Sequence, residues 1–320
     1  MERFLMIGEA LVDVVQMPDG RRTDHPGGSP ANVALTTARL GHGTDLLTWI
    51  ARDEAGDMVQ EHLRASGVVV LPQSIRATRT PTAVAVVDDA GGARYDFDLE
   101  WELAPSTVGP EVTVVHTGSI AAVAPTSPPD ALASVLTAAR ESATITYDPN
   151  LRPSIMGSAS AVRDQVERLV ACADVVKVSD EDLAWLYPGS DPLDVLARWV
   201  SDHALAMGVV TRGAQGPVAV LRNGERARVA APVVTVVDTI GAGDSFMGGL
   251  LHALDAQGLT GARGRSALTA MTADAATELL SVAARVAAIT VSRAGANPPT
   301  LDEMAESPRA HLLDGSATQR

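Results

Sequence analysis

Short apolar runs alternate with helix-length amphipathic segments along most of the 320 residues, and this rhythm restricts the fold more than any other feature. The runs are apolar throughout, as in strands covered on both faces of a sheet. Helical patterns between them favour βαβ units and a mostly parallel sheet. We therefore predict an α/β fold. The expected strands are 4–7, 46–50, 112–116, 144–147, 175–178 and 209–211, and the expected helices are 30–40, 55–66, 129–140, 160–172 and 192–203.

Two early segments break this rhythm. Residues 82–99 read as strand, Gly-rich turn and strand, and residues 12–25 read as extended chain around a Pro-Asp-Gly turn. We predict that they form a small antiparallel sheet projecting from the main layer as a lid over a site. An edge extension of the main sheet is the alternative. A further hairpin is expected at 217–229, where Asn223-Gly224 is a strong two-residue turn signal.

No internal repeat or linker divides the chain, so residues 1–300 are expected to form a single domain. Its lid would come from about 12–27 and 80–101. The polar tail at 301–320 is predicted to be partly disordered. An exposed lid sheet has edges that a second subunit can cover, so a homodimer through the lid is a reasonable expectation.

The composition excludes several classes of protein. With 25 basic and 39 acidic residues the net charge is −14, which argues against a nucleic-acid partner. The single cysteine, Cys172, excludes an intrachain disulfide and a multi-cysteine metal site. The opening apolar run is interrupted by Gly8, Glu9 and Asp13, and no apolar stretch reaches 18 residues. We therefore expect neither a signal peptide nor a membrane span, and a cytoplasmic protein.

Among the 25 basic residues, Lys177 is the only lysine. Codon bias is the simplest explanation, and a specific role for this side chain is the alternative. A P-loop of the form GxxxxGK[ST] needs lysine directly after glycine, whereas Lys177 follows Val176. If the protein handles ATP, it uses another device.

The most specific segment is the glycine turn, residues 238–244, which follows the strand-like run 233–237 and precedes an apolar helical stretch to about 257. A strand, a glycine turn and a helix start leave backbone N–H groups unpaired at the positive end of the helix dipole. Such a place suits an anion. Gly241 and Gly243 let the backbone approach a phosphate closely, so the amides of 241–244 could cradle a phosphoryl group.

Asp244 lies directly beside this expected phosphate site, where a carboxylate repels the ligand unless it has a chemical purpose. A general base has such a purpose, because it accepts the proton of an attacking hydroxyl while the amides hold the phosphoryl group. The alternative is an ordinary helix-capping aspartate. From the turn alone, both interpretations stay open.

The string DTIGAGDSFMGGLL at 238–251 resembles the C-terminal signature of the ribokinase, or PfkB, family of carbohydrate kinases. Residues 27–41 are similar to the family's N-terminal GGxxxNxA…LG motif, and residues 8–13 resemble its first strand and the acidic residue after it. Further matches follow in the family's order, from residue 4 to about 299, at 116–120, 148–152, 177–183 and 211–216. The resemblance implies a ribokinase-like three-layer αβα fold with a small β-sheet lid.

The resemblance also implies roles for individual residues. Those expected to bind the sugar hydroxyls are Asp13, Gly27, Gly28 and Asn32. The residues themselves allow a plainer interpretation, in which the two glycines only turn the chain and Asn32 caps a helix. The family's catalytic base falls on Asp244 and its anion hole on Gly241, Ala242 and Gly243, which agrees with the roles inferred from the turn.

The remaining assignments concern the nucleotide and cations. Ser179 and Asp182 stand where the family has an asparagine-x-x-glutamate motif, so Asp182 is expected to support Mg²⁺ through water. The adenine contacts stay open, since Arg285 stands where relatives often carry asparagine. The candidate nucleotide-binding residues are Lys177, Ser179, Thr211, Gly213 and Gly216, and those for a monovalent cation such as K⁺ are Asp238, Ile240, Arg293 and Gly295.

Within the family, the strings GEALVD, PGGSPANVA, HTGSI and DPNLRP are most similar to fructokinases. The resemblance implies transfer of the γ-phosphoryl group of MgATP to a primary hydroxyl of D-fructose. A 2-keto-3-deoxygluconate kinase is the nearest alternative, because Arg152 could grip a substrate carboxylate. The acidic lid segment 96–101 lowers that alternative. Ribokinase or nucleoside kinase ranks lower, and a non-catalytic sugar- or nucleotide-binding sensor is the alternative from a different class.

Overall fold

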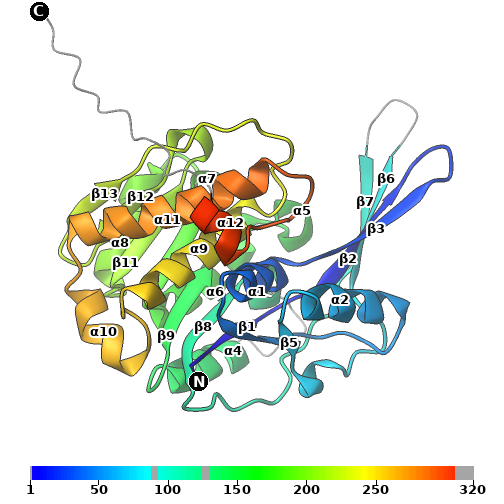
Figure 1. The fold of residues 1–320 in the computed structure, drawn as a ribbon, viewed down its shortest axis with the longest axis horizontal. Helices are drawn as coiled ribbons and strands as arrows, with labels where there is room; N and C mark the ends of the chain where they lie inside the picture. Colours follow the sequence, from blue (N-terminus) through cyan, green and yellow to red (C-terminus); the bar gives the residue numbers. More distant parts are fainter. Residues whose placement is uncertain (1, 88–92, 124–129, 307–320) are drawn as a thin grey trace, which may run out of the picture.

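A nine-stranded, mostly parallel sheet forms the centre of the computed structural model, which describes residues 2–87, 93–123 and 130–306 (Figure 1). The strand order is β13-β12-β11-β10-β9-β8-β1-β4-β5. Only the last hairpin at one edge, β12 and β13, pairs antiparallel. The strands are β1 (Arg3–Ile7), β4 (Gly43–Leu47), β5 (Val69–Val70), β8 (Val112–Gly118), β9 (Thr144–Asp148), β10 (Val175–Ser179), β11 (Met207–Thr211), β12 (Val218–Leu221) and β13 (Arg226–Arg228).

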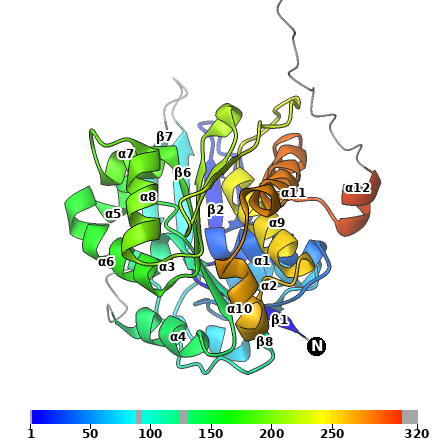
Figure 2. The same cartoon turned by 90° about the vertical axis from the view of Figure 1, so that its left-hand side faces the viewer.

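Helices cover both faces of this sheet, which gives three layers (Figure 2). Alternate residues of one strand serve the two faces, so Phe4 and Met6 pack toward one helical layer and Leu5 and Ile7 toward the other. The first layer contains α1 (Ser29–Arg39), α2 (Glu54–Arg64), α9 (Ala242–Ala256), α10 (Gly261–Thr269) and α11 (Ala273–Val291). The second contains α3 (Ser119–Val123), α4 (Ala131–Ala139), α5 (Pro153–Met156), α6 (Ala159–Cys172), α7 (Asp180–Leu186) and α8 (Pro192–Asp202).

The expected α/β fold is confirmed, and each of the six predicted strands and five predicted helices has a counterpart. The predicted hairpin is also present, because β12 and β13 flank Asn223-Gly224. None of the helices in the described ranges has the length and apolarity needed to cross a membrane.

The strand-like prediction for residues 233–237 is wrong. The segment is irregular, and Val233, Val236 and Val237 are exposed. β-branched residues favour an extended backbone, but a strand also needs a neighbouring strand with free hydrogen-bonding groups. Here the amide of Val237 instead donates to the carbonyl of Val291 at the end of α11.

A second, four-stranded sheet projects from the body at the upper right of Figure 1, in the order β3-β2-β6-β7. Its strands are β2 (Leu11–Gln16), β3 (Arg22–Gly27), β6 (Thr82–Val87) and β7 (Ala93–Asp98). We call this sheet the lid. The lid was expected to be antiparallel, but its central pair, β2 and β6, is parallel, since the chain crosses the main sheet between these strands. Residues 88–92 of the predicted segment lie outside the described residues.

The segment 301–306, which the sequence analysis assigns to the polar tail, forms helix α12 (Leu301–Glu306). Met304 of this helix packs against Leu40 and Val286. Two short 3-10 turns, Pro72–Ser74 and Gly213–Gln215, complete the described elements, and residues 307–320 lie outside them.

Helices α1 and α9 meet closely at one glycine. A Cβ atom at Gly248 would lie 2.5 Å from both Cβ and Cγ2 of Thr36. Both residues are buried, so the Thr36 side chain cannot turn toward solvent to make room. The contact holds α1 against α9, and both helices carry predicted site residues.

We expect Gly248→Ala to destabilise the protein by about 1–3 kcal/mol, because the added methyl group overfills a packed helix contact. Thermal unfolding measures the effect as a lower melting temperature. Adding Thr36→Ser removes Cγ2 and should recover part of the loss. An unchanged melting temperature for Gly248→Ala would show that the two helices separate without cost.

Candidate active site

Asp244 lies in the first turn of α9, and its side chain is held by hydrogen-bond donors from two distant parts of the chain. The hydroxyl of Ser29 donates to Oδ1 at 2.7 Å, and Nδ2 of Asn32 donates to Oδ2 at 2.8 Å. A longer bond of 3.4 Å joins Nδ2 of Asn150 to Oδ1. With the residue only 7% exposed, these donors fix the orientation of the carboxylate. Asp244 is therefore more than a local cap of its own helix.

The start of α1 depends on the paired glycines that the sequence singled out. Gly28 is the N-cap residue with φ 106°, and a Cβ atom there would lie 2.5 Å from the carbonyl oxygen of Glu9. Gly27 has the same need for a different reason, since its Cβ would lie 2.4 Å from Oδ2 of Asp13. At Gly28 only glycine fits, because the close neighbours are backbone atoms, whereas a side chain at Gly27 would displace the Asp13 carboxylate.

The glycine turn forms the start of α9. Gly241 is the N-cap of α9 in the left-handed region, with φ 72°. The amides of Gly243 and Asp244 belong to the first helical turn and have no acceptor within the helix. The amide of Ala242 donates to the carbonyl of Thr239 at 3.2 Å, so this part of the predicted cradle is already used by the turn.

Beside this turn lies a buried ion pair that joins neighbouring strands. Nζ of Lys177 on β10 lies 2.7 Å from Oδ2 of Asp148 at the end of β9, and both side chains are almost fully buried. Burial raises the pKa of Asp148 to about 6, although the Lys177 ammonium acts in the opposite direction. The charges of Asp182 and Asp244 also raise it, which shows that three carboxylates converge here.

The predicted nucleotide residues line the neighbouring strand ends. Ser179 and Thr211 are paired across β10 and β11. The hydroxyl of Ser179 accepts a hydrogen bond from the amide of Asp182 at 3.0 Å, so Ser179 also caps α7. Gly213 and Gly216 both have positive φ, and at Gly216 a Cβ would lie 2.1 Å from a carbonyl oxygen. These glycines are needed by the turn whatever else they bind.

Asp13 lies on the lid, in register with His25 on the adjacent strand, so the two side chains share one face. The surrounding protein raises the pKa of Asp13, against the favourable charges of His25 and Arg152. Arg152 is anchored by Asn150, whose Oδ1 accepts from its Nη1 at 2.8 Å. Asp13, Gly27, Asn32 and Arg152, all expected to bind sugar, therefore surround one region in front of Asp244.

The four residues expected around a monovalent cation are only partly brought together. Asp238 accepts hydrogen bonds from the amides of Ile240 at 3.0 Å and Gly295 at 2.9 Å, and these bonds lower its pKa. The side chain of Arg293 points elsewhere, to an ion pair with Glu303. Any contribution of Arg293 to a cation would come from its backbone.

Four residues of the site were missed as site residues by the sequence analysis. Ser29 and Asn150 contact Asp244, Asp148 pairs with Lys177, and Glu9 accepts from the amides of Ser29 at 3.4 Å and Ala121 at 3.0 Å. The available signal for Asp148 and Asn150 was their position directly after a buried strand, where ligands gather in open α/β sheets.

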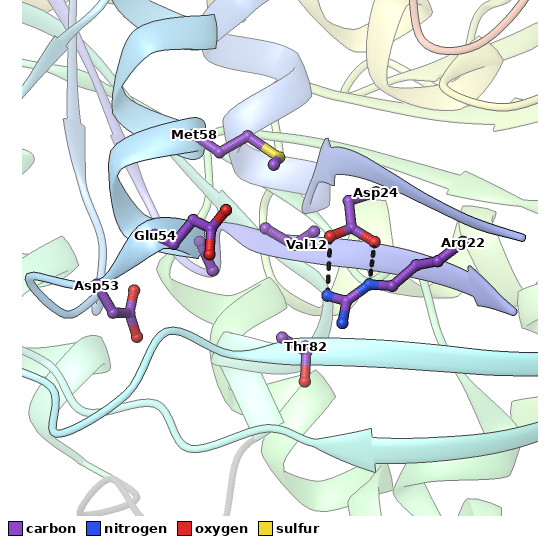
Figure 3. A pocket seen from close by; sticks show the side chains of 8 residues that line it. Val12, Arg22, Asp24, Asp53, Glu54, Met58 and Thr82 are labelled. Atoms are coloured by element: carbon purple, nitrogen blue, oxygen red, sulfur yellow. Dashed lines mark hydrogen bonds and ion pairs between the residues drawn. The ribbon is translucent and has the colours of Figure 1, made fainter.

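A cavity of about 480 Å³ lies between the lid and α2 (Figure 3). It is lined by Val12 of β2 and by Arg22 and Asp24 of β3, which form an ion pair. Because Val12 and Asp13 are consecutive in a strand, they point to opposite faces of the lid. The cavity is therefore behind the lid relative to the proposed sugar face.

Comparisons with known proteins identify the family of this chain. The model of the pfkB family of carbohydrate kinases matches residues 1–303. A fructokinase from Klebsiella pneumoniae is 32% identical over 264 residues, covering 80% of this chain and 86% of that one. The chain belongs to the pfkB family of carbohydrate kinases and is a sugar phosphotransferase.

Solved structures show the same fold. A fructokinase from Xylella fastidiosa with bound ATP matches with a TM-score of 0.79 and 23% identity, covering 95% of this chain and 97% of that chain. A double mutant of Vibrio cholerae fructokinase with fructose, ADP and potassium ion bound matches with a TM-score of 0.72 and 26% identity, covering 92% and 94%. The expected ribokinase-like αβα architecture with a smaller sheet is thereby confirmed.

The buried Glu9 makes stability depend on pH. Burial raises the pKa of Glu9 to about 7, from an ordinary value of 4.5. Its folded-state pKa is above the unfolded one, so its stabilising contribution is present below about pH 4.5 and is lost as the pH rises through 7. We compare the melting temperature of Glu9→Gln with that of wild type at each pH. This difference should become more positive by roughly 2 °C or more as the pH rises from 5 to 8.

The exposed Glu141 provides the control, since Glu141→Gln should change the melting temperature equally at both pH values. Scanning fluorimetry at pH 5, 6, 7 and 8 measures both variants. The same difference for Glu9→Gln at every pH would contradict a buried, titrating Glu9.

Proposed function

We propose that this sugar kinase is a fructokinase that transfers the γ-phosphoryl group of MgATP to a primary hydroxyl of D-fructose. The observation that carries the proposal is the buried Asp244 carboxylate, held at the N-terminus of α9 beside unpaired backbone amides. The choice of sugar is supported by similarity to fructokinases, of which the Klebsiella pneumoniae protein is 32% identical to this chain.

In this proposal the sugar lies between the lid and the ends of the central strands. Asp13 accepts hydrogen bonds from its hydroxyl groups, Asn32 and the amides near Gly28 contribute further contacts, and the lid excludes water that would otherwise hydrolyse ATP. The nucleotide enters from the side of Thr211 and the glycine turn. The γ-phosphate faces the amides of Gly243 and Asp244.

Asp244 then acts as general base. It takes the proton of the attacking hydroxyl while the O–P bond to the sugar forms and the P–O bond to the β-phosphate breaks. Its hydrogen bonds from Ser29 and Asn32 aim the carboxylate and leave little freedom for other orientations. Positioning and charge stabilisation account for most of the catalysis in phosphoryl transfer.

Asp182 remains the proposed support for a magnesium ion, through water, since no three acidic or histidine side chains within the described ranges form a group that could hold a metal directly. Three carboxylates, from Asp148, Asp182 and Asp244, surround the single ammonium of Lys177. Oxygen ligands with retained waters are what Mg²⁺ prefers, and the bound ion would neutralise charge on the phosphates. Asp238, with the carbonyls near Ile240 and Gly295, remains the proposed place for K⁺.

Arg152 bears on the choice between a neutral and an acidic sugar. Its Nη1 is already engaged by three acceptors from Asn150 and Leu151, at 2.8–3.2 Å. These bonds leave the Nε and Nη2 edge of the guanidinium, which could still clamp a carboxylate. The acidic segment 96–101 of the sequence therefore remains the argument for fructose over 2-keto-3-deoxygluconate. The exposed edge strand β3 of the lid also supports the proposal of a dimer formed through the lid.

A coupled assay of ADP release tests the proposed substrate. The panel contains fructose, ribose, 2-keto-3-deoxygluconate, glucose and adenosine with MgATP, each with and without K⁺. We expect kcat/KM for fructose to exceed the others by about tenfold or more, because unmatched hydroxyl groups leave buried polar groups unpaired. No turnover of any of these by folded protein would overturn the proposal and favour a non-catalytic sensor.

We expect Asp244→Asn to lower kcat by about 10²–10⁴-fold and to leave the KM for fructose within about threefold. Asp255→Asn on the far end of the same helix is the matched control and should keep kcat within about twofold. Steady-state kinetics on both variants decide the point. Retention of more than about a tenth of wild-type kcat by Asp244→Asn would remove Asp244 from the role of base.

A further inference from the structure

The ammonium group of Lys177 lies directly beside the glycine turn. A Cβ atom at Gly243 would be 3.0 Å from Nζ of Lys177, so the absence of a side chain at Gly243 leaves room for this charge. Lys177 is 3% exposed and Gly243 is partly exposed. The ammonium thus lies beneath the surface on which the proposed γ-phosphate rests.

Only one of the three protons on Nζ has a partner among the described contacts, namely Oδ2 of Asp148 at 2.7 Å. A buried ammonium with donors to spare is costly unless something else receives them. Its neighbour His116 offers no compensating charge, because burial and the charge of Lys177 lower the pKa of that imidazole to about 3.

The choice of lysine is itself informative. The chain uses arginine at every other basic position, so its general preference does not explain Lys177. A guanidinium is planar and wide, whereas an ammonium is a compact point charge with three donors. The gap between Asp148 and the backbone of Gly243 suits the compact group.

We propose that Nζ of Lys177 donates a hydrogen bond to a non-bridging oxygen of the transferring phosphoryl group, and that Asp148 is the positioning residue that aims it. The proposal rests on the function proposed above. Lys177 keeps its protons throughout: the sugar hydroxyl proton goes to Asp244, the sugar O–P bond forms, and the bond to the β-phosphate oxygen breaks with ADP as leaving group. The ammonium offsets charge on the phosphoryl oxygens during this exchange.

The test separates contacts with the γ-phosphate from contacts with the rest of the nucleotide. Calorimetry measures the affinities for MgADP and for a non-hydrolysable MgATP analogue, and their ratio gives the preference for the γ-phosphate. Lys177→Met should reduce this preference by about tenfold or more while the MgADP affinity stays within about threefold. With fructose, kcat should fall by about 10²-fold or more.

Arg140→Met is the matched control. Arg140 forms an ion pair of the same length, 2.7 Å, with the nearly buried Asp174. Asp174 immediately precedes β10, at the amino-terminal end of that strand. Its removal should lower thermal stability without changing the preference for the ATP analogue. A loss of preference in Arg140→Met as large as in Lys177→Met would show a general structural effect and overturn the proposal.

A double-mutant cycle tests the role of Asp148. If Asp148 acts through Lys177, Asp148→Asn lowers kcat in the wild-type background but has little further effect on Lys177→Met. The double variant has no unpaired buried charge, so it also replaces Lys177→Met if that variant fails to fold. Additive effects of the two substitutions would exclude a positioning role for Asp148.

The outcomes distinguish this proposal from the proposed function. An unchanged preference for the ATP analogue in folded Lys177→Met or in the double variant overturns the role of Lys177, whatever the substrate. An equal loss of MgADP and analogue affinity overturns it as well. If wild type phosphorylates no sugar of the panel while the preference still depends on Lys177, the fructokinase proposal fails and the phosphate contact stands.

Discussion

The hydrogen bonds of Ser29 and Asn32 with Asp244 are the contact on which the arrangement of the site depends. They join residues more than 200 positions apart in the chain and link the first turn of α1 to the first turn of α9. The close packing of Gly248 against Thr36 lets the two helices approach. Residues expected to bind the sugar begin α1, and the glycine turn expected to bind phosphate begins α9, so one pair of helices would bring the two proposed substrates together.

The lid is also linked to the start of α1, through Glu9. The backbone of Glu9 and Ala10 leads from β1 into β2, and the carboxylate of Glu9 receives the amides that open α1 and lie within α3. The lid is thus anchored to the same buried group that fixes the start of α1. Burial raises the pKa of Glu9 to about 7. The packing at the start of α1 therefore depends on whether this one carboxyl group is protonated.

The sequence predicted the features that arise from local patterns. Uniformly apolar strands and intervening helices indicated a mostly parallel sheet covered on both faces, and the glycine turn before an apolar stretch indicated the start of helix α9 at Ala242. It could not show that β2 and β6 run parallel, because that pairing depends on a crossover through the main sheet. It also predicted a strand at 233–237, where the β-branched residues have no neighbouring strand to pair with. The contacts of Ser29, Asn150 and Asp148 were invisible for a related reason, since each is made with a residue far away in the chain.

The irregular segment 233–237 has a consequence for the behaviour of the protein in solution. It presents Val-Val-Thr-Val-Val without a charge or a proline, and Val233 is fully exposed. Segments of high β propensity and low charge are templates for intermolecular strand pairing when they lie at the surface. The net charge of −14 opposes such association through repulsion between molecules. High salt screens that repulsion, so this segment makes concentrated, high-salt solutions the conditions in which the folded enzyme is most prone to aggregate.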